Sequence, residues 1–400
     1  MTIKQLQRAT LQCQGLTKKY PFGKGKKAAL SVLEHLGYVQ IDTLSVVERA
    51  HHHTLWSRLP DYQTEYLDQL VEERDVFEYW FHAASYLPMK DFRYALPQMR
   101  QFKRGEARFY NTIDPKILDY VHDKIRLDGP QKARDFASHN KKSGSWWDWK
   151  PTKIALERLF MQGDLMVCGR EGMEKIYDLT ERVLPGTVNT TEPGSLEFAE
   201  YLVKTYLRAY GITTIKQITH LRTGKALRKN AEQVLQTMLE AQTVQQVKID
   251  GMPTIFALSD LLENSIKKPS PSIRLLSPFD NSVIHRERLE QLFGFDFRLE
   301  CYTPKPKRQY GYFCLPILFG DEFIGRIDCK AHRKNNQFEI IHLHIEKRQG
   351  DIEVWLKPLV KTIQQFAIFN GCQSIRLSQV NSPKLLGILK PFFAENEMMF

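Results

Sequence analysis

Apolar residues recur at helical spacing through the first two thirds of the chain and alternate with polar residues in the last third. In the segment 28–37 the apolar positions lie three or four apart and end at Gly37, which predicts a helix closed by its glycine. The segment 65–89 begins as another helix and runs into aromatic residues that we interpret as core packing. We therefore predict an N-terminal helical or winged-helix unit over residues 1–110.

The next stretch predicts three helices followed by a hairpin. The helical segments are 116–129, 131–136 and 151–164, the last beginning at a proline and ending at a glycine. Two apolar strands in 165–179 flank the predicted turn Gly169–Gly172. Three helices followed by a hairpin are typical of a winged helix, which we place at residues 111–190.

The same order of elements recurs further along the chain. Helices are predicted at 195–211, 213–221 and 226–242, and two strands follow, joined through the two-residue turn Asp250-Gly251. This pattern predicts a second winged helix at residues 191–265. The repeat concerns the order of the elements rather than the letters of the sequence.

A segment rich in proline and serine, residues 266–272, is typical of a linker. Beyond it, short alternating strands predict a β-rich, barrel-like domain over residues 273–400 with terminal helices. The predicted fold class is α+β, with tandem winged-helix domains followed by this β-rich domain.

Charge narrows the range of partners. The 400 residues include 57 Lys and Arg against 46 Asp and Glu, a formal net charge of +11, which favours a polyanion such as nucleic acid. The sequence has no apolar run of membrane-spanning length and no apolar signal segment at its start, so we expect a cytoplasmic protein without a membrane partner. We also expect a monomer that associates with the nucleoid when it acts on DNA. The six cysteines form no CxxC pair, which argues against a zinc knuckle or a disulfide framework.

Basic residues gather in the predicted winged helices and in one proline-punctuated loop, where they could contact DNA phosphates. A solvated basic face is an equally compatible interpretation. The candidates are Lys150, Lys153, Arg158, Arg170, Lys175, Arg222, Lys225, Arg228, Lys229, Lys305, Lys307 and Arg308.

Three adjacent histidines, His51, His52 and His53, suggest a metal site at first. Neighbouring side chains diverge on a regular helix or strand, and no carboxylate or cysteine pattern completes a ligand set. We expect no metal and no cofactor, and we keep these histidines as candidates for lining a substrate cleft.

Gln40, Ile41 and Asp42 follow the first predicted helix. In an extended conformation Gln40 and Asp42 point to one face, where an amide and a carboxylate could hold and activate a water molecule. The residues alone leave a second interpretation open, in which Asp42 caps the helix that follows.

A resemblance to a known family bears on this choice. The stretches YVQIDTLSVVERAHHHTLWSRLP (38–60), LLSPFDNSVIHRERLEQLFGFDFRLECYTPKPKRQYGYFCLPILFGD (275–321) and FIGRIDCKA (323–331) resemble the YcaQ/AlkZ family of winged-helix DNA glycosylases. The likeness extends from about residue 5 to the C-terminus. It is strongest to the YcaQ-like (AlkX) branch, whose Gln–hydrophobe–Asp motif matches Gln40, Ile41 and Asp42; the AlkZ branch has Gln at the third position.

The resemblance implies tandem winged helices, a C-terminal β-rich domain, and excision of alkylated purines from double-stranded DNA, including unhooking of interstrand crosslinks, with Gln40 and Asp42 as catalytic residues. An N7-alkylpurine is already cationic, so it leaves without a general acid, and one carboxylate can stabilise the sugar cation and activate water. The competing hypotheses are a winged-helix transcription regulator without catalytic activity and a metal-dependent nuclease, which would need an acidic cluster that the sequence lacks.

Overall fold

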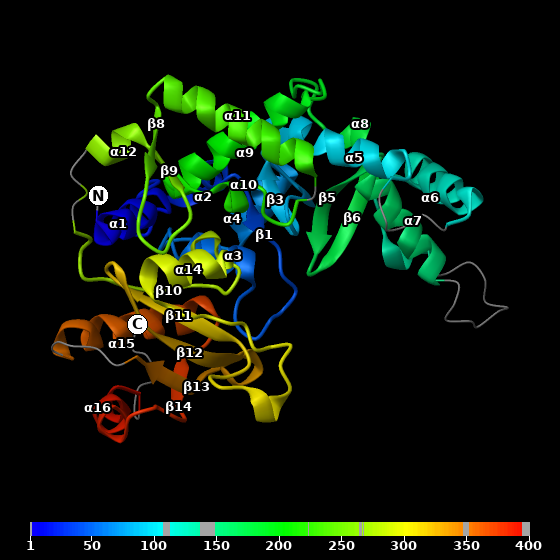
Figure 1. The fold of residues 1–400 in the computed structure, drawn as a ribbon. Helices are drawn as coiled ribbons and strands as arrows, with labels where there is room; N and C mark the ends of the chain where they lie inside the picture. Colours follow the sequence, from blue (N-terminus) through cyan, green and yellow to red (C-terminus); the bar gives the residue numbers. More distant parts are fainter. Residues whose placement is uncertain are drawn as a thin grey trace.

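A computed structural model describes residues 2–106, 113–136, 149–222, 224–263, 266, 268–346 and 352–393. Helices and strands mix along the whole chain, and the strands form three small sheets and one larger C-terminal sheet (Figure 1). No helix in the described ranges is both long and apolar enough to cross a membrane. The fold is therefore a mixed α+β arrangement.

The first sheet belongs to the N-terminal unit and has the strand order β1-β3-β2. Helix α1 precedes the unit, and a helical connection, η1 and α5, follows it. The elements are α1 Ile3–Cys13, α2 Gly25–Leu36, β1 Val39–Gln40, α3 Ala50–Trp56, α4 Glu65–Glu72, β2 Val76–Trp80, β3 Ala84–Pro88, η1 Met89–Ala95 and α5 Leu96–Lys103. Helix α2 ends as predicted at Gly37, whose positive φ of 81° suits a residue without a Cβ.

The aromatic segment after α4 is a hairpin, which the sequence pattern did not separate from core packing. Residues of β2 pair antiparallel with β3, and Gln40 of β1 pairs with Ser85 of β3. The aromatic side chains do reach the core, since Phe77 and Tyr79 are buried. The hairpin nevertheless also presents its tip, residues 81–83, beside β1.

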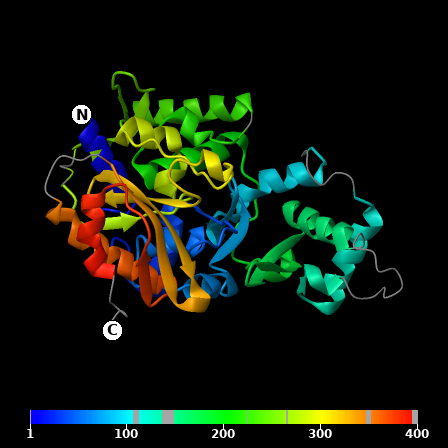
Figure 2. The ribbon, with the colours of Figure 1, turned by 90° about the horizontal axis from the view of Figure 1, so that it is seen from below.

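The second unit has the sheet order β4-β6-β5 and stands apart from the C-terminal sheet (Figures 1 and 2). The predicted second helix at 131–136 is instead a two-residue strand followed by a 3₁₀ turn. The predicted turn at Gly169–Gly172 is shifted, because β5 continues through Gly169 and the chain reverses at Gly172 and Met173. The elements are α6 Pro115–Asp128, β4 Gln131–Lys132, η2 Ala133–Phe136, α7 Trp149–Met161, β5 Leu165–Glu171, β6 Glu174–Leu179 and α8 Thr180–Val183.

The third unit repeats this arrangement with the order β7-β9-β8. Asp250 and Gly251 do lie in a turn, but the prediction of a two-residue hairpin is wrong, since residues 248–254 connect the two strands. The elements are α9 Ser195–Tyr210, β7 Ile212–Thr213, α10 Ile215–Ile218, α11 Lys225–Glu240, β8 Val244–Val247, β9 Ile255–Leu258 and α12 Ser259–Glu263.

All three units therefore share one topology: a helix, a short strand, further helical segments and a hairpin whose second strand pairs with the short strand. The three units also share one hydrophobic core, in which residues such as Phe77, Leu159 and Leu202 belong to a single buried cluster. The common core fixes the position of each unit relative to the next.

The C-terminal part contains a curled, five-stranded half-barrel sheet of order β10-β11-β12-β13-β14, covered on one side by α15 (Figure 1). It is antiparallel except for the parallel pair β13–β14. The elements are β10 Ile273–Leu275, α13 Asn281–Ile284, α14 Arg286–Phe293, η3 Lys305–Lys307, β11 Cys314–Phe319, β12 Glu322–His332, η4 Arg333–Asn335, β13 Gln337–Ile345, α15 Glu353–Phe369, β14 Ser374–Leu377 and α16 Pro383–Phe393.

The segment between β1 and α3 is anchored on this C-terminal sheet. Val47 is fully buried in the core of the sheet, and the amide of Ala331 donates to the carbonyl oxygen of Val46 at 2.9 Å. Behind it, the buried guanidinium of Arg58 forms a bidentate pair with Asp280, at 2.7 and 3.0 Å. The chain that carries Asp42 is thus held between the first unit and the C-terminal sheet.

Candidate active site

Strand β1 places Gln40 beside the β2–β3 hairpin of the first unit. Its backbone pairs with Ser85, and its side chain is only 9% exposed. The Oε1 atom of Gln40 lies 3.1 Å from Nε2 of His82, a residue of the hairpin tip. Since a carbonyl oxygen can only accept, His82 donates through Nε2, and the NH₂ group of Gln40 is left for another partner.

His82 is held in its neutral form. Burial, followed by the nearby His220 and Arg222, lowers the pKa of His82 to about 3. Its ring also packs edge-on against Tyr38, at a centroid distance of 4.9 Å. A neutral ring fixed in this way orients the Gln40 amide without adding a charge to the site.

Asp42 lies just beyond the end of β1. Its Oδ1 accepts a hydrogen bond at 2.8 Å from the amide of Leu44, two residues later. This local turn, formed by the aspartate side chain and the backbone, fixes the orientation of the carboxylate. Burial raises the pKa of Asp42 above its usual value, and the Leu44 hydrogen bond opposes that rise. No helix begins there, because α3 starts at Ala50. The interpretation of Asp42 as a helix cap is therefore wrong.

The loop before β11 faces Asp42 from the C-terminal part. The thiol of Cys301 has a raised pKa because of burial and then of the Asp42 charge, and the pKa of Tyr302 is raised by Cys301, by burial and by Asp42. These electrostatic effects indicate that the loop lies within electrostatic range of the Asp42 carboxylate. Tyr302 is 83% exposed, so its ring is available to a ligand.

A cavity of about 520 Å³ opens next to the hairpin tip. Trp80, Phe81, Phe198 and Arg222 are among its lining residues, and Trp80 is 45% exposed. One of these lining residues, Phe81, directly precedes His82 in the sequence. Neither Trp80 nor His82 was predicted as a site residue, because the run VFEYWFHAAS (76–85) has the pattern of core packing. The histidine at position 82 of this aromatic run was the signal that could have indicated a site.

The three adjacent histidines all lie on α3 and are buried. Nδ1 of His52 is 2.8 Å from the Tyr62 hydroxyl, and Nε2 of His53 donates to the Leu275 carbonyl oxygen at 2.9 Å, so both serve packing between elements. His51 packs its ring against Tyr86 at 5.7 Å. Burial lowers the pKa of all three. Within the described ranges, no group of three or more His, Cys, Asp or Glu residues is placed to hold a metal ion.

Several basic candidates form internal contacts. The guanidinium of Arg170 lies 2.7 Å from the buried Glu78 carboxylate, and the Lys175 ammonium group lies 3.2 Å from it. The Arg222 guanidinium lies over the rings of Phe81 and Phe198, at 4.8 and 5.4 Å, and burial lowers its pKa. These side chains tie elements together, and two of them join the second unit to β2.

The remaining basic candidates are distributed over the surface. Arg308 donates to the Thr303 carbonyl oxygen at 2.8 Å, and Arg228 pairs with Glu232 at 3.0 Å. Arg158 is half-buried, and the side chain of Lys150 lies outside the described residues. The exposed lysines are Lys153, Lys225, Lys229, Lys305 and Lys307, of which the last two lie on the loop that faces Asp42.

Comparison with known proteins found a similar solved structure and a matching family model. A solved structure, the Streptomyces sahachiroi DNA glycosylase AlkZ, matches 95% of this chain over 100% of its own length, with a TM-score of 0.62 and 18% sequence identity. At that identity the match shows a shared fold. A family model described as DNA glycosylase AlkZ-like matches residues 33–360, which include Gln40, Asp42, the hairpin and most of the C-terminal sheet. The chain therefore belongs to the AlkZ-like family of DNA glycosylases.

Proposed function

We propose that this protein is a monofunctional DNA glycosylase of the YcaQ-like branch that hydrolyses the N-glycosidic bond of cationic N7-alkylpurines and unhooks interstrand crosslinks. The observation that carries the proposal is the hydrogen bond from His82 to Gln40, which leaves the Gln40 NH₂ group free beside the Asp42 segment. The Gln40-Ile41-Asp42 motif has the pattern of that branch.

The residues suit hydrolysis of a base that is already charged. When the bond between the sugar C1′ and the base nitrogen breaks, its electron pair moves to the base and cancels the positive charge, so no general acid is required. The Asp42 carboxylate stabilises the positive sugar and takes a proton from the attacking water, while the Gln40 NH₂ group donates to the water oxygen. The products are the free base and an abasic site.

Two exposed aromatic residues flank this chemistry. Tyr302 lies within electrostatic range of Asp42, and Trp80 lines the cavity next to the hairpin tip that carries His82. A cationic purine is attracted to the face of an aromatic ring, more strongly so when the site is partly desolvated. Selectivity for charged lesions thus has two sources. The base leaves readily only when it carries a positive charge, and the aromatic rings of Tyr302 and Trp80 attract a cationic base.

The three units with a common topology are proposed to be winged helices that hold the DNA duplex. The described surface lysines, such as Lys225 and Lys229 at the start of α11, are proposed to contact phosphates. A site bounded by separate units can receive a guanine that is still tethered to the opposite strand. This would permit the unhooking of a crosslink, which a closed base-flipping pocket would exclude.

The direct test compares wild type with Asp42→Asn on duplex DNA containing N7-methylguanine and on a nitrogen-mustard crosslink. We expect release of the base and formation of an abasic site by wild type, and a loss of at least about 100-fold in Asp42→Asn, since one amide would replace the only carboxylate of the motif. EDTA should leave the rate unchanged. Equal rates for the two proteins would reject the assignment of Asp42, and sequence-specific DNA binding without base release would favour a transcription regulator.

The monofunctional character has a separate test. Residues 28–89 contain no lysine, so no amine lies near the motif in sequence, although Lys305 and Lys307 lie on the loop facing Asp42. A lyase step would need one of these amines to form a Schiff base with the sugar. We expect no covalent DNA adduct after borohydride treatment; an adduct lost in Lys305→Gln or Lys307→Gln would show a lyase activity.

A further inference from the structure

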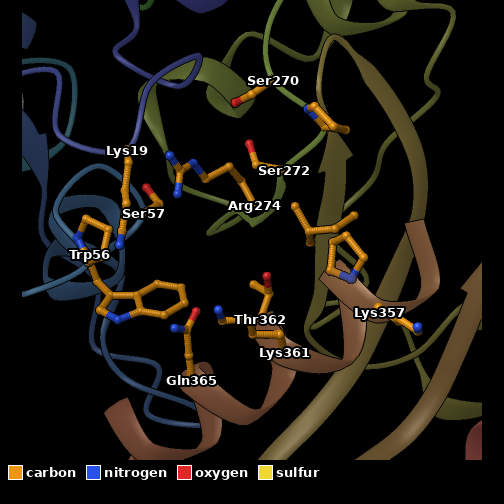
Figure 3. A pocket seen from close by; sticks show the side chains of 14 residues that line it. Lys19, Trp56, Ser57, Ser270, Ser272, Arg274, Lys357, Lys361, Thr362 and Gln365 are labelled. Atoms are coloured by element: carbon orange, nitrogen blue, oxygen red, sulfur yellow. The ribbon is translucent and has the colours of Figure 1, made fainter. Parts of the chain in front are cut away.

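A second cavity, of about 510 Å³, lies on a different part of the molecule from Gln40 and Asp42. It is bounded by the chain before α2, the end of α3, strand β10 and helix α15 (Figure 3). Four basic residues line it, Lys19, Arg274, Lys357 and Lys361, and no carboxylate occurs among its described lining residues. The described lining of the cavity therefore carries a net positive charge.

Arg274 is the most constrained of these cations. Its Nη2 donates to the Lys18 carbonyl oxygen at 2.7 Å, whereas its buried Nε has no hydrogen-bond partner among the described residues. Burial, together with the charge of Arg58, lowers the pKa of Arg274 to about 10, so it still carries its charge at neutral pH. The half-buried guanidinium has no counterion among the described residues, and a bound anion would offset the cost of its partial desolvation.

The surrounding groups suit an oxyanion. Figure 3 shows the Arg274 guanidinium directed toward Ser57 and Lys19, and Lys357 pointing away from the cavity. Lys361 is exposed and has no ion-pair partner in the described part of the chain. The hydroxyls of Ser272 and Thr362 also line the cavity and could donate to phosphate oxygens.

Trp56 adds an aromatic wall to the charged one. Its indole ring stacks on Phe369 at 5.3 Å with an interplanar angle of 17°, which fixes its orientation. In Figure 3 the indole extends into the cavity opposite Arg274. A cationic side and a flat apolar side in one space match a molecule that joins a phosphate to an aromatic base.

We propose that this cavity binds a mononucleotide, with its phosphate held by Arg274, Lys361 and Lys19 and its base against Trp56. Either a free nucleotide or the phosphorylated end of a DNA strand carries this chemistry. None of the three units' hairpins and none of the residues around Gln40 and Asp42 line the cavity. Binding here is therefore separate from the proposed base release.

The experiment is calorimetric titration of the full chain with adenosine 5′-monophosphate, adenosine and inorganic phosphate. The variants are Lys19→Gln/Lys361→Gln and, as a matched control, Lys384→Gln, which removes an exposed lysine of α16 outside the cavity. We expect one-site binding of the monophosphate, about ten-fold weaker in the double variant and unchanged in the control. Trp56→Leu should weaken the monophosphate but leave inorganic phosphate unaffected.

Competition with a 5′-phosphorylated DNA trinucleotide separates the two sources, since it displaces the monophosphate only if a strand end can enter. No binding of the monophosphate at about 10 mM, an equal effect of the control substitution, or equal affinity for inorganic phosphate would overturn the proposal. Base release from N7-methylguanine DNA is expected to be the same in every variant, so this proposal and the glycosylase proposal fail separately.

Discussion

His82 and Gln40 are 42 positions apart in sequence and meet through a hydrogen bond of 3.1 Å between Nε2 and Oε1. Strand pairing makes the contact possible, because β3 brings the hairpin tip alongside β1. The Nε2–H group of His82 donates to the amide oxygen of Gln40, so the NH₂ group of Gln40 faces away from the histidine. His82 acts in this arrangement as a positioning residue for Gln40.

Replacing His82 by phenylalanine should slow base release while preserving the ring contacts with Tyr38 and Phe81. Loss of one orienting hydrogen bond predicts a fall in kcat of about ten-fold, with little change in KM. Single-turnover release of N7-methylguanine measures it. In a double-mutant cycle, Gln40→Met and His82→Phe should be non-additive by about 1 kcal/mol; strictly additive effects would contradict a shared role.

The pH dependence of base release should follow Asp42. Its pKa is raised by burial, so the active carboxylate is lost as the pH falls through a value above the usual one for aspartate. His82, with a pKa of about 3, stays neutral throughout the working range and contributes no limb near neutrality. A rate profile with one acidic limb checks this. A second limb near pH 6.5 that disappears in His82→Phe would show that His82 is protonated instead.

Substitutions of the basic candidates should separate into two groups. Lys225→Gln and Lys229→Gln should weaken duplex binding and lower the slope of log affinity against log salt by about one for each lost phosphate contact. Arg170→Gln should instead lower the free energy of unfolding, because it leaves the Glu78 carboxylate, 3% exposed, with one cation fewer. Salt-dependent binding and urea unfolding distinguish the groups. An unchanged salt slope in both lysine variants would place the phosphate contacts elsewhere.

The sequence predicted those features of the fold that depend on residues within a single helix or strand. Gly37 ends α2, and the long helices α9 and α11 lie where their apolar spacing predicted them. The curled C-terminal sheet likewise followed from alternation, and the predicted helix α15 precedes its last strand, β14. These features depend on local spacing and on glycine conformation, which a single sequence displays directly.

Contacts between segments that are distant in sequence could not be predicted from the sequence. In the sequence, Arg170 and Lys175 have the pattern of exposed cations on a hairpin. In the structure both pair with Glu78 of β2. His82 and Trp80 were hidden in an aromatic run whose fold as a hairpin depends on pairing with β1. Whether a charged or aromatic side chain lies in the core or on the surface depends on the residues that it contacts, and tertiary packing determines those contacts.

The Arg58–Asp280 pair should be a major determinant of stability. Both side chains are fully buried, and the guanidinium also donates to the Gln14 and Thr54 carbonyl oxygens at 2.8 and 2.9 Å. Arg58→Met would leave the Asp280 carboxylate buried without its cation, at a cost of about 3–5 kcal/mol in the free energy of unfolding. Urea denaturation measures the loss. Lys384→Gln, at an exposed position of α16, should leave stability unchanged; a loss below 1 kcal/mol in Arg58→Met would contradict a buried, mutually dependent pair.

Buried neutral histidines should make the protein sensitive to mild acid. The pKa values of His52, His53 and His82 are lowered by burial to about 3, 4 and 3. Because the folded state resists protonation, each contributes stability that is present above the unfolded pKa of about 6.5 and is lost as the pH falls below it. These three contribute about 4 kcal/mol to the decrease in the free energy of unfolding between pH 7.5 and 5.5. The buried His51 and His285, whose pKa values burial also lowers, add to this decrease. Urea unfolding at both pH values measures the decrease, and in His82→Phe it should be smaller by about 1.4 kcal/mol. Equal wild-type stability at the two pH values would mean that these rings accept protons in the folded state.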